Sequence, residues 1–226
     1  MDILNTPKTT NRIVRSSLSE QAAQTIKSWI LSLRLKPGER LIVDNLAEEL
    51  AISRTPIREG LQKLVAERLV VYDGKSYTVM EFSKRDIENL FEIRCALEVL
   101  ASRQASVRMS DVRVRVLRDW YEHWNAYQQK TDIEFFVAQD RHFHQSLCEG
   151  AGNSQLQRLL DSLHEQWWWI IRIIYEPRIT AYDRKSSMEE HQAVLACIEK
   201  RDSDGAADAM ARHLYRSEVE MLQYLK

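Results

Sequence analysis

Apolar residues recur at helical spacing near the start of the chain, after a polar stretch over residues 1–16. The string Ser17-Leu18-Ser19-Glu20 is a capping box, in which a serine and a glutamate three residues later satisfy free backbone N–H groups. The apolar positions that follow share one helical face: Ala22, Ile26, Ile30 and Leu33. We therefore predict a helix that opens at this box and ends at Lys36-Pro37-Gly38.

Two further helices and a hairpin complete the pattern of the N-terminal part. We expect a short helix over residues 45–50, with Asp44 as its N-cap. A third helix begins near Ser53-Arg54-Thr55-Pro56, because proline is tolerated in a first turn whose N–H groups lack helical partners anyway. β-prone runs at residues 69–72 and 76–79 flank a glycine turn and predict a hairpin. Three helices followed by a hairpin form the pattern of a winged helix-turn-helix.

After Ser83 the apolar spacing stays helical to the end of the chain. We predict six helices, at about 84–108, 111–129, 132–149, 153–175, 184–201 and 203–225. The predicted fold class is mainly α, with a winged helix-turn-helix followed by an antiparallel all-helical bundle. The predicted divisions are a flexible arm over 1–16, the winged domain over 17–81 and the bundle over 84–226.

Composition narrows the class of protein. A chain of 226 residues is long enough for two domains, and only six glycines and four prolines leave room for few tight turns. No apolar run reaches the roughly 20 residues that span a bilayer, and the N-terminus contains no apolar signal segment. Three scattered cysteines indicate buried thiols rather than a disulfide framework. We therefore expect a cytoplasmic protein with no membrane partner.

The start of the third predicted helix carries side chains suited to DNA. In a helix-turn-helix, the second helix of the motif enters the major groove, where arginines can bond to guanine and hydroxyls to phosphate. The predicted DNA-binding residues are Arg40, Ser53, Arg54, Thr55, Pro56, Arg58 and Lys75. The alternative is a surface helix with ordinary solvated arginines. The net charge of −1 hardly discriminates, although residues 1–82 are slightly basic and the remainder slightly acidic.

Three residue strings decide between these alternatives. They are Pro37-Gly38-Glu39-Arg40-Leu41, Leu46-Ala47-Glu48-Glu49-Leu50 and Ser53-Arg54-Thr55-Pro56-Ile57-Arg58-Glu59. Together they closely resemble the DNA-binding domain of the GntR regulator family, in which the last string opens the recognition helix. The resemblance spans roughly residues 18–80 and implies a double-stranded DNA operator as partner. Two positions depart from the family pattern: Ala51 replaces the usual glycine, and Gly60 replaces the usual alanine, which should cost up to about 1 kcal/mol within a helix.

Four polar residues on inward faces of the predicted bundle form a candidate metal site. Asp140 and His144 are four residues apart and share a helical face, while His191 and His213 lie on apolar stripes of two other helices. Three imidazoles and a carboxylate suit a divalent transition metal, zinc first, with nickel, manganese or iron as alternatives. Each histidine taken singly could instead be a hydrogen-bonded core residue. That structural role is our interpretation of His123, His142 and His164.

Arg94 lies on an apolar stripe of the first bundle helix, and a buried guanidinium needs an anion. Glu98, one turn later, could supply that anion, or the carboxylate of an effector could do so. Trp167-Trp168-Trp169 spans about 300° of a helix, so the three rings cannot all face one way. We assign Trp168 to the effector pocket and Arg172 to a second effector contact, with core or interface packing as the alternative for the tryptophans.

Further strings extend the resemblance to the C-terminal part. They are Phe91-Glu92-Ile93-Arg94-Cys95-Ala96-Leu97-Glu98, Asp140-Arg141-His142-Phe143-His144, Ala151-Gly152-Asn153, Glu190-His191 and Arg212-His213-Leu214. They resemble the C-terminal FCD domain of the FadR branch of the GntR family, over about residues 85–222. Six helices fit its VanR-type subgroup. The resemblance implies that Asp140, His144, His191 and His213 are metal ligands and that Arg94 binds the effector.

The leading hypothesis is a homodimeric repressor that reads a palindromic operator and is controlled by a small organic acid at the metal and Arg94. We expect no enzymatic activity. A metal-dependent enzyme is the alternative, although the chain contains no HExxH or GxSxG motif and offers no evident extra general base. A nucleoid-type DNA protein with a purely structural bundle is a third possibility.

Overall fold

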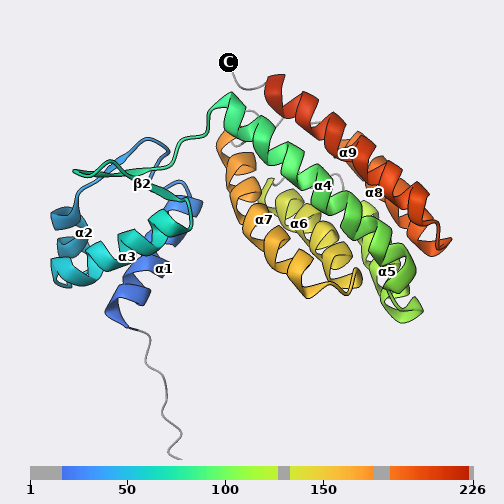
Figure 1. Cartoon of the computed structure of the whole chain (residues 1–226), viewed down its shortest axis with the longest axis horizontal. Coiled ribbons are helices and arrows are strands. Elements are labelled where there is room, and N and C mark those ends of the chain that lie inside the picture. The colour runs from blue at the N-terminus through green and yellow to red at the C-terminus, as the bar shows by residue number, and fades with distance from the viewer. Residues whose placement is uncertain (1–16, 127–132, 176–183, 224–226) are drawn as a thin grey trace, which may run out of the picture. The chain divides into compact units, whose positions relative to one another are not determined.

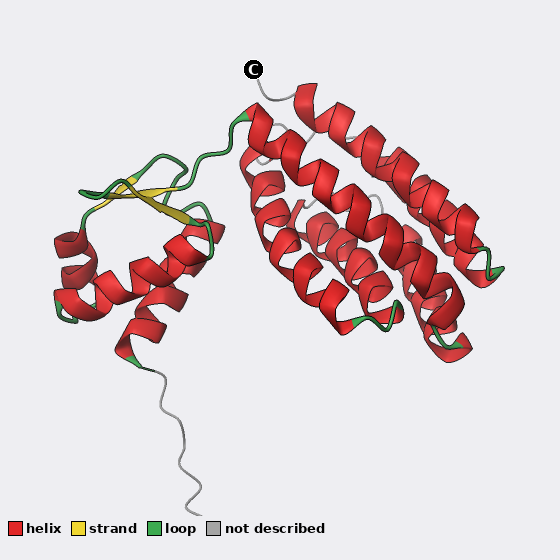
Figure 2. Cartoon of the chain, in the orientation of Figure 1, coloured by secondary structure: helices red, strands yellow, loops and turns green. Residues whose placement is uncertain are grey.

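A computed structural model describes residues 17–126, 133–175 and 184–223. The predicted arm over residues 1–16 lies outside these ranges. Contacts between residues divide the chain into two compact units, Met1–Glu81 and Phe82–Lys226. Figures 1 and 2 show a small unit of helices and strands and a larger unit of helices. Each unit is described by itself.

The first unit combines three helices with a small antiparallel sheet. Its elements are α1 (Leu18–Leu31), β1 (Arg40–Leu41), α2 (Val43–Glu49), α3 (Arg54–Ala66), β2 (Val70–Tyr72) and β3 (Tyr77–Val79). The predicted hairpin is present as β2 and β3, with Val71 opposite Thr78. Strand β1 pairs with the other edge of β3 and was not predicted, because two residues are too few to show an alternating pattern.

The serine half of the predicted capping box of α1 is confirmed, whereas the predicted cap of α2 is wrong. The Ser17 hydroxyl accepts a bond from the backbone N–H of Glu20 at 3.2 Å. Helix α2 begins at Val43, before Asp44, and the Ile42 cap position makes no side-chain bond. The Asp44 carboxylate instead lies 2.6 Å from Nε of Arg54. It therefore joins α2 to the first turn of α3.

The core of the first unit lies where α1 packs on α3. Ile26 and Ile30 of α1 and Ile57, Leu61 and Leu64 of α3 are fully buried. Gly60 lies in the same interface, and a Cβ atom at this position would meet the Ala23 nitrogen at 3.0 Å and the Ser19 carbonyl oxygen at 3.1 Å. The glycine thus lets two helix backbones approach closely, which compensates for its low helix propensity.

Ala51 follows α2 in a conformation that favours glycine. Its φ is +52°, in the left-handed region, and it directly follows the C-cap residue Leu50. Glycine is preferred at this position because it has no Cβ to meet the backbone. Of the two departures from the family pattern, Gly60 therefore allows close helix packing, whereas Ala51 holds the chain in a strained conformation.

The second unit is a bundle of long helices. They are α4 (Lys84–Arg108), α5 (Asp111–Ala126), α6 (Ile133–Gly150), α7 (Ser154–Tyr175), α8 (Arg184–Glu199) and α9 (Ser203–Gln223). The predicted helices agree with them to within two residues wherever the chain is described. In Figure 1, α4 lies between α9 on one side and α6 and α7 on the other. Nothing in the described ranges is both long and apolar enough to be a membrane-spanning helix.

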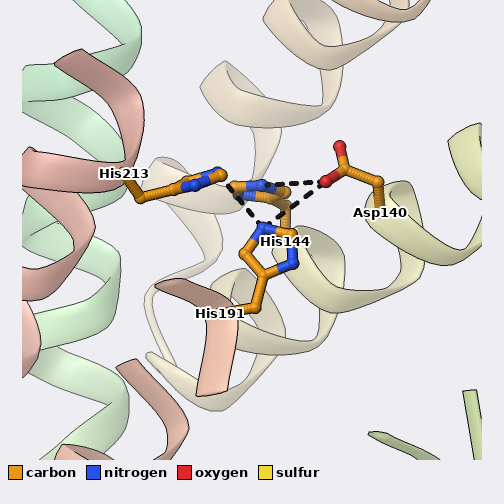
Figure 3. A group of neighbouring side chains, drawn as sticks. All are labelled: Asp140, His144, His191 and His213. Carbon is orange, nitrogen blue, oxygen red and sulfur yellow. Dashed lines mark hydrogen bonds and ion pairs between the residues drawn. The ribbon is translucent and has the colours of Figure 1, made fainter. Parts of the chain in front are cut away.

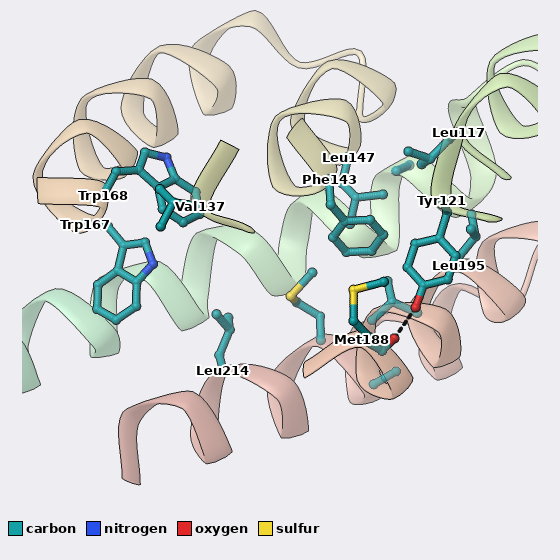
Figure 4. Close-up of a cluster of buried hydrophobic side chains, with 14 of the residues drawn as sticks. Leu117, Tyr121, Val137, Phe143, Leu147, Trp167, Trp168, Met188, Leu195 and Leu214 are labelled. Carbon is teal, nitrogen blue, oxygen red and sulfur yellow. Dashed lines mark hydrogen bonds between the residues drawn. The ribbon is translucent and has the colours of Figure 1, made fainter. Parts of the chain in front are cut away.

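Aromatic and aliphatic side chains from every helix of the second unit fill its core. Figure 4 shows Phe143 and Leu147 facing Tyr121, Met188 and Leu195. The Tyr121 hydroxyl donates to the Met188 carbonyl, which links α5 to α8. Burial raises the pKa of Tyr121 to about 12. The same core encloses the polar residues of the candidate site.

Replacing Gly60 by alanine should destabilise the first unit although alanine favours helices. The clash with the α1 backbone, typically about 1–3 kcal/mol for an overpacked core, outweighs a propensity gain of up to about 1 kcal/mol. Urea unfolding monitored by hydrogen exchange of peptides from residues 17–81 measures this unit separately. The exposed neighbour Glu59→Ala is the control. Equal or higher stability of Gly60→Ala would contradict the close approach.

Ala51→Gly should stabilise the same unit. Relief of the left-handed conformation, worth about 1–2 kcal/mol, exceeds the entropy that glycine adds to the unfolded chain, about 0.4–1 kcal/mol. The same hydrogen-exchange measurement should show a gain of roughly 0.5–1 kcal/mol. A loss of stability would show that Ala51 is not strained.

Candidate metal centre and DNA-binding surface

Four buried side chains converge inside the second unit. They come from three helices: Asp140 and His144 from α6, His191 from α8 and His213 from α9. Each offers one ligand atom, and these atoms all lie within 4.8 Å of one another. Figure 3 shows the three imidazoles and the carboxylate pointing toward one point. The spacing of residues in the sequence predicted the helical faces, and the structure brings these faces together.

The distances match those between ligands of one ion. Nε2 of His191 lies 3.1 Å from Nε2 of His213, and Oδ1 of Asp140 lies 3.4 Å from Nε2 of His191. Nε2 of His144 is 3.9 Å from the same carboxylate oxygen. Neighbouring ligand atoms bound at about 2.0–2.2 Å to one ion are separated by about 3–3.5 Å. The four residues therefore fit a divalent ion after small side-chain adjustments.

Hydrogen bonds on the outer side of two imidazoles support this fit. Nδ1 of His144 bonds to Glu98, and Nδ1 of His213 lies 2.9 Å from Oε2 of Glu190. Each carboxylate accepts a hydrogen bond from Nδ1–H, which leaves the lone pair of the neutral imidazole on Nε2, directed at the centre. Nε2 of His144 is buried and finds no hydrogen-bond partner among the described residues. A buried lone pair of this kind is suited to a cation.

Electrostatics favour the neutral imidazoles that a metal requires. Burial, reinforced by the neighbouring imidazoles, lowers the pKa of His191 well below its usual value. Burial also lowers the pKa of His213, although Glu190 opposes the shift. Both rings are therefore neutral near pH 7, with lone pairs available for coordination.

Arg94 forms an ion pair with Glu98, which is one of the two partners expected from the sequence; the other is the carboxylate of an effector. Nε and Nη2 of the guanidinium lie 2.8 and 2.7 Å from Oε1 of Glu98. The guanidinium also stacks over the ring of Trp167 at 4.2 Å. Burial would raise the pKa of Glu98, but Arg94 and the nearby histidines outweigh it and hold this pKa well below its usual value. Nη1 of Arg94 is buried and makes no hydrogen bond within the described ranges.

All three adjacent tryptophans are buried, on different sides of α7. Trp167 packs edge-on against Phe91, and Trp169 does so against Phe82. The Trp168 ring centroid lies 6.2 Å from that of His144. Its Nε1 is buried with no partner among the residues that the structure covers. Trp168 is therefore the tryptophan beside the metal-ligand cluster, and Arg172 lies half-buried one turn later.

Sequence reasoning missed part of this network. His164 is the hydrogen-bonded core residue that we predict, but its partner was not foreseen: its Nε2 lies 3.1 Å from Oε1 of Glu98. Glu190 appears in the sequence analysis only within the string Glu190-His191. Nothing in that string indicates that its carboxylate contacts His213. His142 lies on the exposed side of α6 against Trp120, at 4.4 Å between ring centroids, so its interpretation as a core residue is wrong.

The start of α3 carries five of the predicted DNA-binding residues, from Ser53 to Arg58. Ser53 is the N-cap residue, and its side chain makes no capping bond. Arg54, Thr55 and Arg58 are exposed, and Pro56 is half-buried in the first turn. The Asp44 carboxylate beside Arg54 is a feature that the sequence did not indicate.

Three of the predicted DNA-binding cations surround one hollow. Arg40 from β1, Arg58 from α3 and Lys75 from the turn between β2 and β3 all line it. Oδ1 of Asp73 accepts the backbone N–H groups of Lys75 and Ser76 at 2.8 and 2.7 Å, which fixes this turn. The fold thus gathers cations from three elements onto one surface, as a phosphate backbone requires.

Comparison with protein families agrees with both parts of this description. Residues 18–79 match the family described as bacterial regulatory proteins, gntR family, and residues 89–216 match the FCD domain. The chain belongs to the GntR family and carries an FCD domain. It is a transcriptional regulator, and the expectation of a non-enzyme agrees with the names of its relatives.

Individual relatives match over nearly the whole chain. The HTH-type transcriptional regulator McbR of Escherichia coli (strain K12) is 28% identical, over 89% of this chain and 91% of its own length. The Nta operon transcriptional regulator of Aminobacter aminovorans is 27% identical, over 87% and 90%. The solved structure of E. coli McbR/YncC covers 94% of this chain and all of its own, with a TM-score of 0.75 and 26% identity. The expected mainly α fold class, with a winged domain and a helical FCD domain, is thereby confirmed.

Arg58→Ala should weaken binding to an operator selected from random DNA with the purified full chain. Loss of an arginine contact to a base or phosphate typically costs about 1–3 kcal/mol, which corresponds to roughly a 5- to 150-fold higher Kd. Fluorescence anisotropy at fixed salt measures the change. Arg115→Ala, which removes an exposed arginine of α5, is the charge-matched control. Equal Kd values for both variants would remove Arg58 from the interface.

Proposed function

We propose that this regulator is a metal-dependent repressor whose operator binding is controlled by a small organic acid. The observation that carries the proposal is the convergence of Asp140, His144, His191 and His213, with carboxylates behind two of the imidazoles. Zinc is the first candidate for the ion, since three imidazoles and one carboxylate suit it, and nickel, manganese and iron remain compatible. A bound ion would supply a positive site for oxygen atoms of the acid.

The first unit would read DNA through α3. Its N-terminal turn carries the exposed Arg54, Thr55 and Arg58, which are placed to reach base edges and phosphates in a major groove. Arg40 and Lys75 would contact the flanking backbone. A homodimer would present two such units to the half-sites of a palindromic operator.

The second unit would sense the acid. Four protein ligands leave positions open at a five- or six-coordinate ion, and Nη1 of Arg94 has no partner among the described residues. A carboxylate could bond to both, with Trp168 and Arg172 as further contacts. The acid would act by binding one conformation of the dimer more tightly than another.

Repression, rather than activation, is favoured by the names of two relatives. The HTH-type transcriptional repressor GlaR of Escherichia coli (strain K12) is 25% identical over 84% of this chain. The Gluconate operon transcriptional repressor of Bacillus licheniformis is 22% identical over 84%.

Purified wild-type protein should contain about one divalent ion per chain, because four ligand atoms surround one point. Chelator treatment should lower its Tm, and zinc should restore it, since an ion that binds only the folded state stabilises that state. Elemental analysis and thermal unfolding measure both effects. His191→Ala should abolish the response to zinc, whereas His142→Ala should keep it. Retention of the ion by His191→Ala would refute the proposed site.

A thermal-shift screen of small carboxylates on zinc-loaded protein should identify the effector class. The expected ligand raises the Tm of wild type but not that of Arg94→Ala or His191→Ala, and it changes operator affinity. A ligand that stabilises all three proteins equally would place the effector elsewhere.

A further inference from the structure

Glu98 is a buried carboxylate near the candidate metal centre that contacts three polar side chains. Only 2% of the residue is exposed. Its Oε1 accepts bonds from Arg94, at 2.8 and 2.7 Å, and from Nε2 of His164 at 3.1 Å. Its Oε2 accepts a bond from Nδ1 of His144. One carboxylate therefore fixes both the guanidinium and a ligand imidazole.

Glu190 provides a useful comparison because it occupies the equivalent position behind His213. It accepts Nδ1 of His213 at 2.9 Å and Nε of Arg216 at 2.6 Å. The Arg216 side chain is 27% exposed and also bonds to Glu220 at 2.8 Å. Both carboxylates orient a ligand imidazole, but Glu190 connects it to an arginine that reaches the surface.

Arg94, the arginine bonded to Glu98, differs from Arg216 because it is buried. The Arg94 side chain is 1% exposed, and two of its three nitrogens are committed to Glu98. The third, Nη1, is buried and has no partner among the described residues. A buried cationic donor of this kind suits an anionic oxygen from a ligand. The path from that donor to His144 passes through a single residue.

We propose that Glu98 is a positioning residue that couples acid binding at Arg94 to metal binding at His144. This inference rests on the proposed function. A metal ion would fix the His144 ring, and this ring would fix the Glu98 carboxylate to which it is bonded. The carboxylate would in turn fix the Arg94 guanidinium. Because the first ligand orders this network, the second loses less conformational freedom on binding, so each ligand strengthens the binding of the other.

The test measures zinc affinity by competition with a chromophoric chelator, with and without saturating acetate as the carboxylate probe. In wild type, acetate should tighten zinc binding by about 5-fold or more. Glu98→Gln and Glu190→Gln should both bind zinc about 10- to 100-fold more weakly, since each removes a carboxylate behind a ligand imidazole. Glu190→Gln should keep the acetate effect, and Glu98→Gln should lose it.

The outcomes separate this inference from the proposed function. Wild-type protein that binds no zinc would overturn both. Zinc binding without an acetate effect in wild type, or with an effect that Glu98→Gln retains, would overturn only the coupling through Glu98. Loss of the acetate effect in both Glu190→Gln and Glu98→Gln would also overturn the coupling through Glu98. The effect would then depend on any carboxylate behind a ligand imidazole and not on Glu98 in particular.

Arg94→Lys provides a second test that does not depend on the folding of Glu98→Gln. Lysine keeps a positive charge beside Glu98, but all of its N–H donors lie on one nitrogen, so it cannot bond to Glu98 from two nitrogens and present a third nitrogen to a ligand. Zinc affinity should change several-fold although this position does not contact the ion, and the acetate effect should disappear. The visible spectrum of the cobalt-substituted protein should likewise stop responding to acetate. Unchanged zinc affinity and an intact acetate response would overturn the coupling.

Discussion

The interior of the helical bundle depends on the pairing of buried charges. An ion removed from water loses several kcal/mol of solvation, and only a close partner of opposite charge restores it. Arg94 and Glu98 meet this requirement within one turn of α4, which allows a strongly polar face to point inward. The same face then presents a carboxylate to His144 and His164 on the neighbouring helices α6 and α7. The pairing on α4 therefore determines where a metal site can be assembled.

The two units satisfy their constraints by different means. The first unit has a small apolar core, and it relies on a glycine that lets α1 and α3 approach closely, while tolerating a strained alanine after α2. Its polar groups stay at the surface, where exposed arginines are solvated until DNA replaces the water. The second unit instead buries the four candidate ligand residues and the Arg94–Glu98 pair. DNA binding by the first unit is thus a surface process that salt will weaken, whereas the binding that we propose for the second unit would order groups in its interior.

Much of this arrangement could be predicted from the sequence. Within the described residues, helical spacing predicts the ends of the bundle helices to within two residues, and the interval between Asp140 and His144 predicts their common face. Spacing along one element reveals which side is buried, but it does not reveal which residue of another element lies opposite. For this reason the partnership of Asp44 with Arg54 and the contact of His164 with Glu98 were missed. Residue spacing left each inward histidine as either a metal ligand or a hydrogen-bonded core residue. The family resemblance is what implied that Asp140, His144, His191 and His213 act together as ligands.

The spacing of residues in the sequence cannot show which ring nitrogen of each histidine directs its lone pair at the centre. An inward histidine can turn either nitrogen to a neighbour, and only the acceptor behind it decides which one carries the proton. Glu98 and Glu190 hold Nδ1 of His144 and His213, so both Nε2 atoms are left to face the centre. The character of the site therefore depends on two carboxylates that do not belong to the ligand set. Glu98 is joined to a buried arginine whose Nη1 has no partner among the described residues, so the proposed metal coordination and acid recognition would share one hydrogen-bond network.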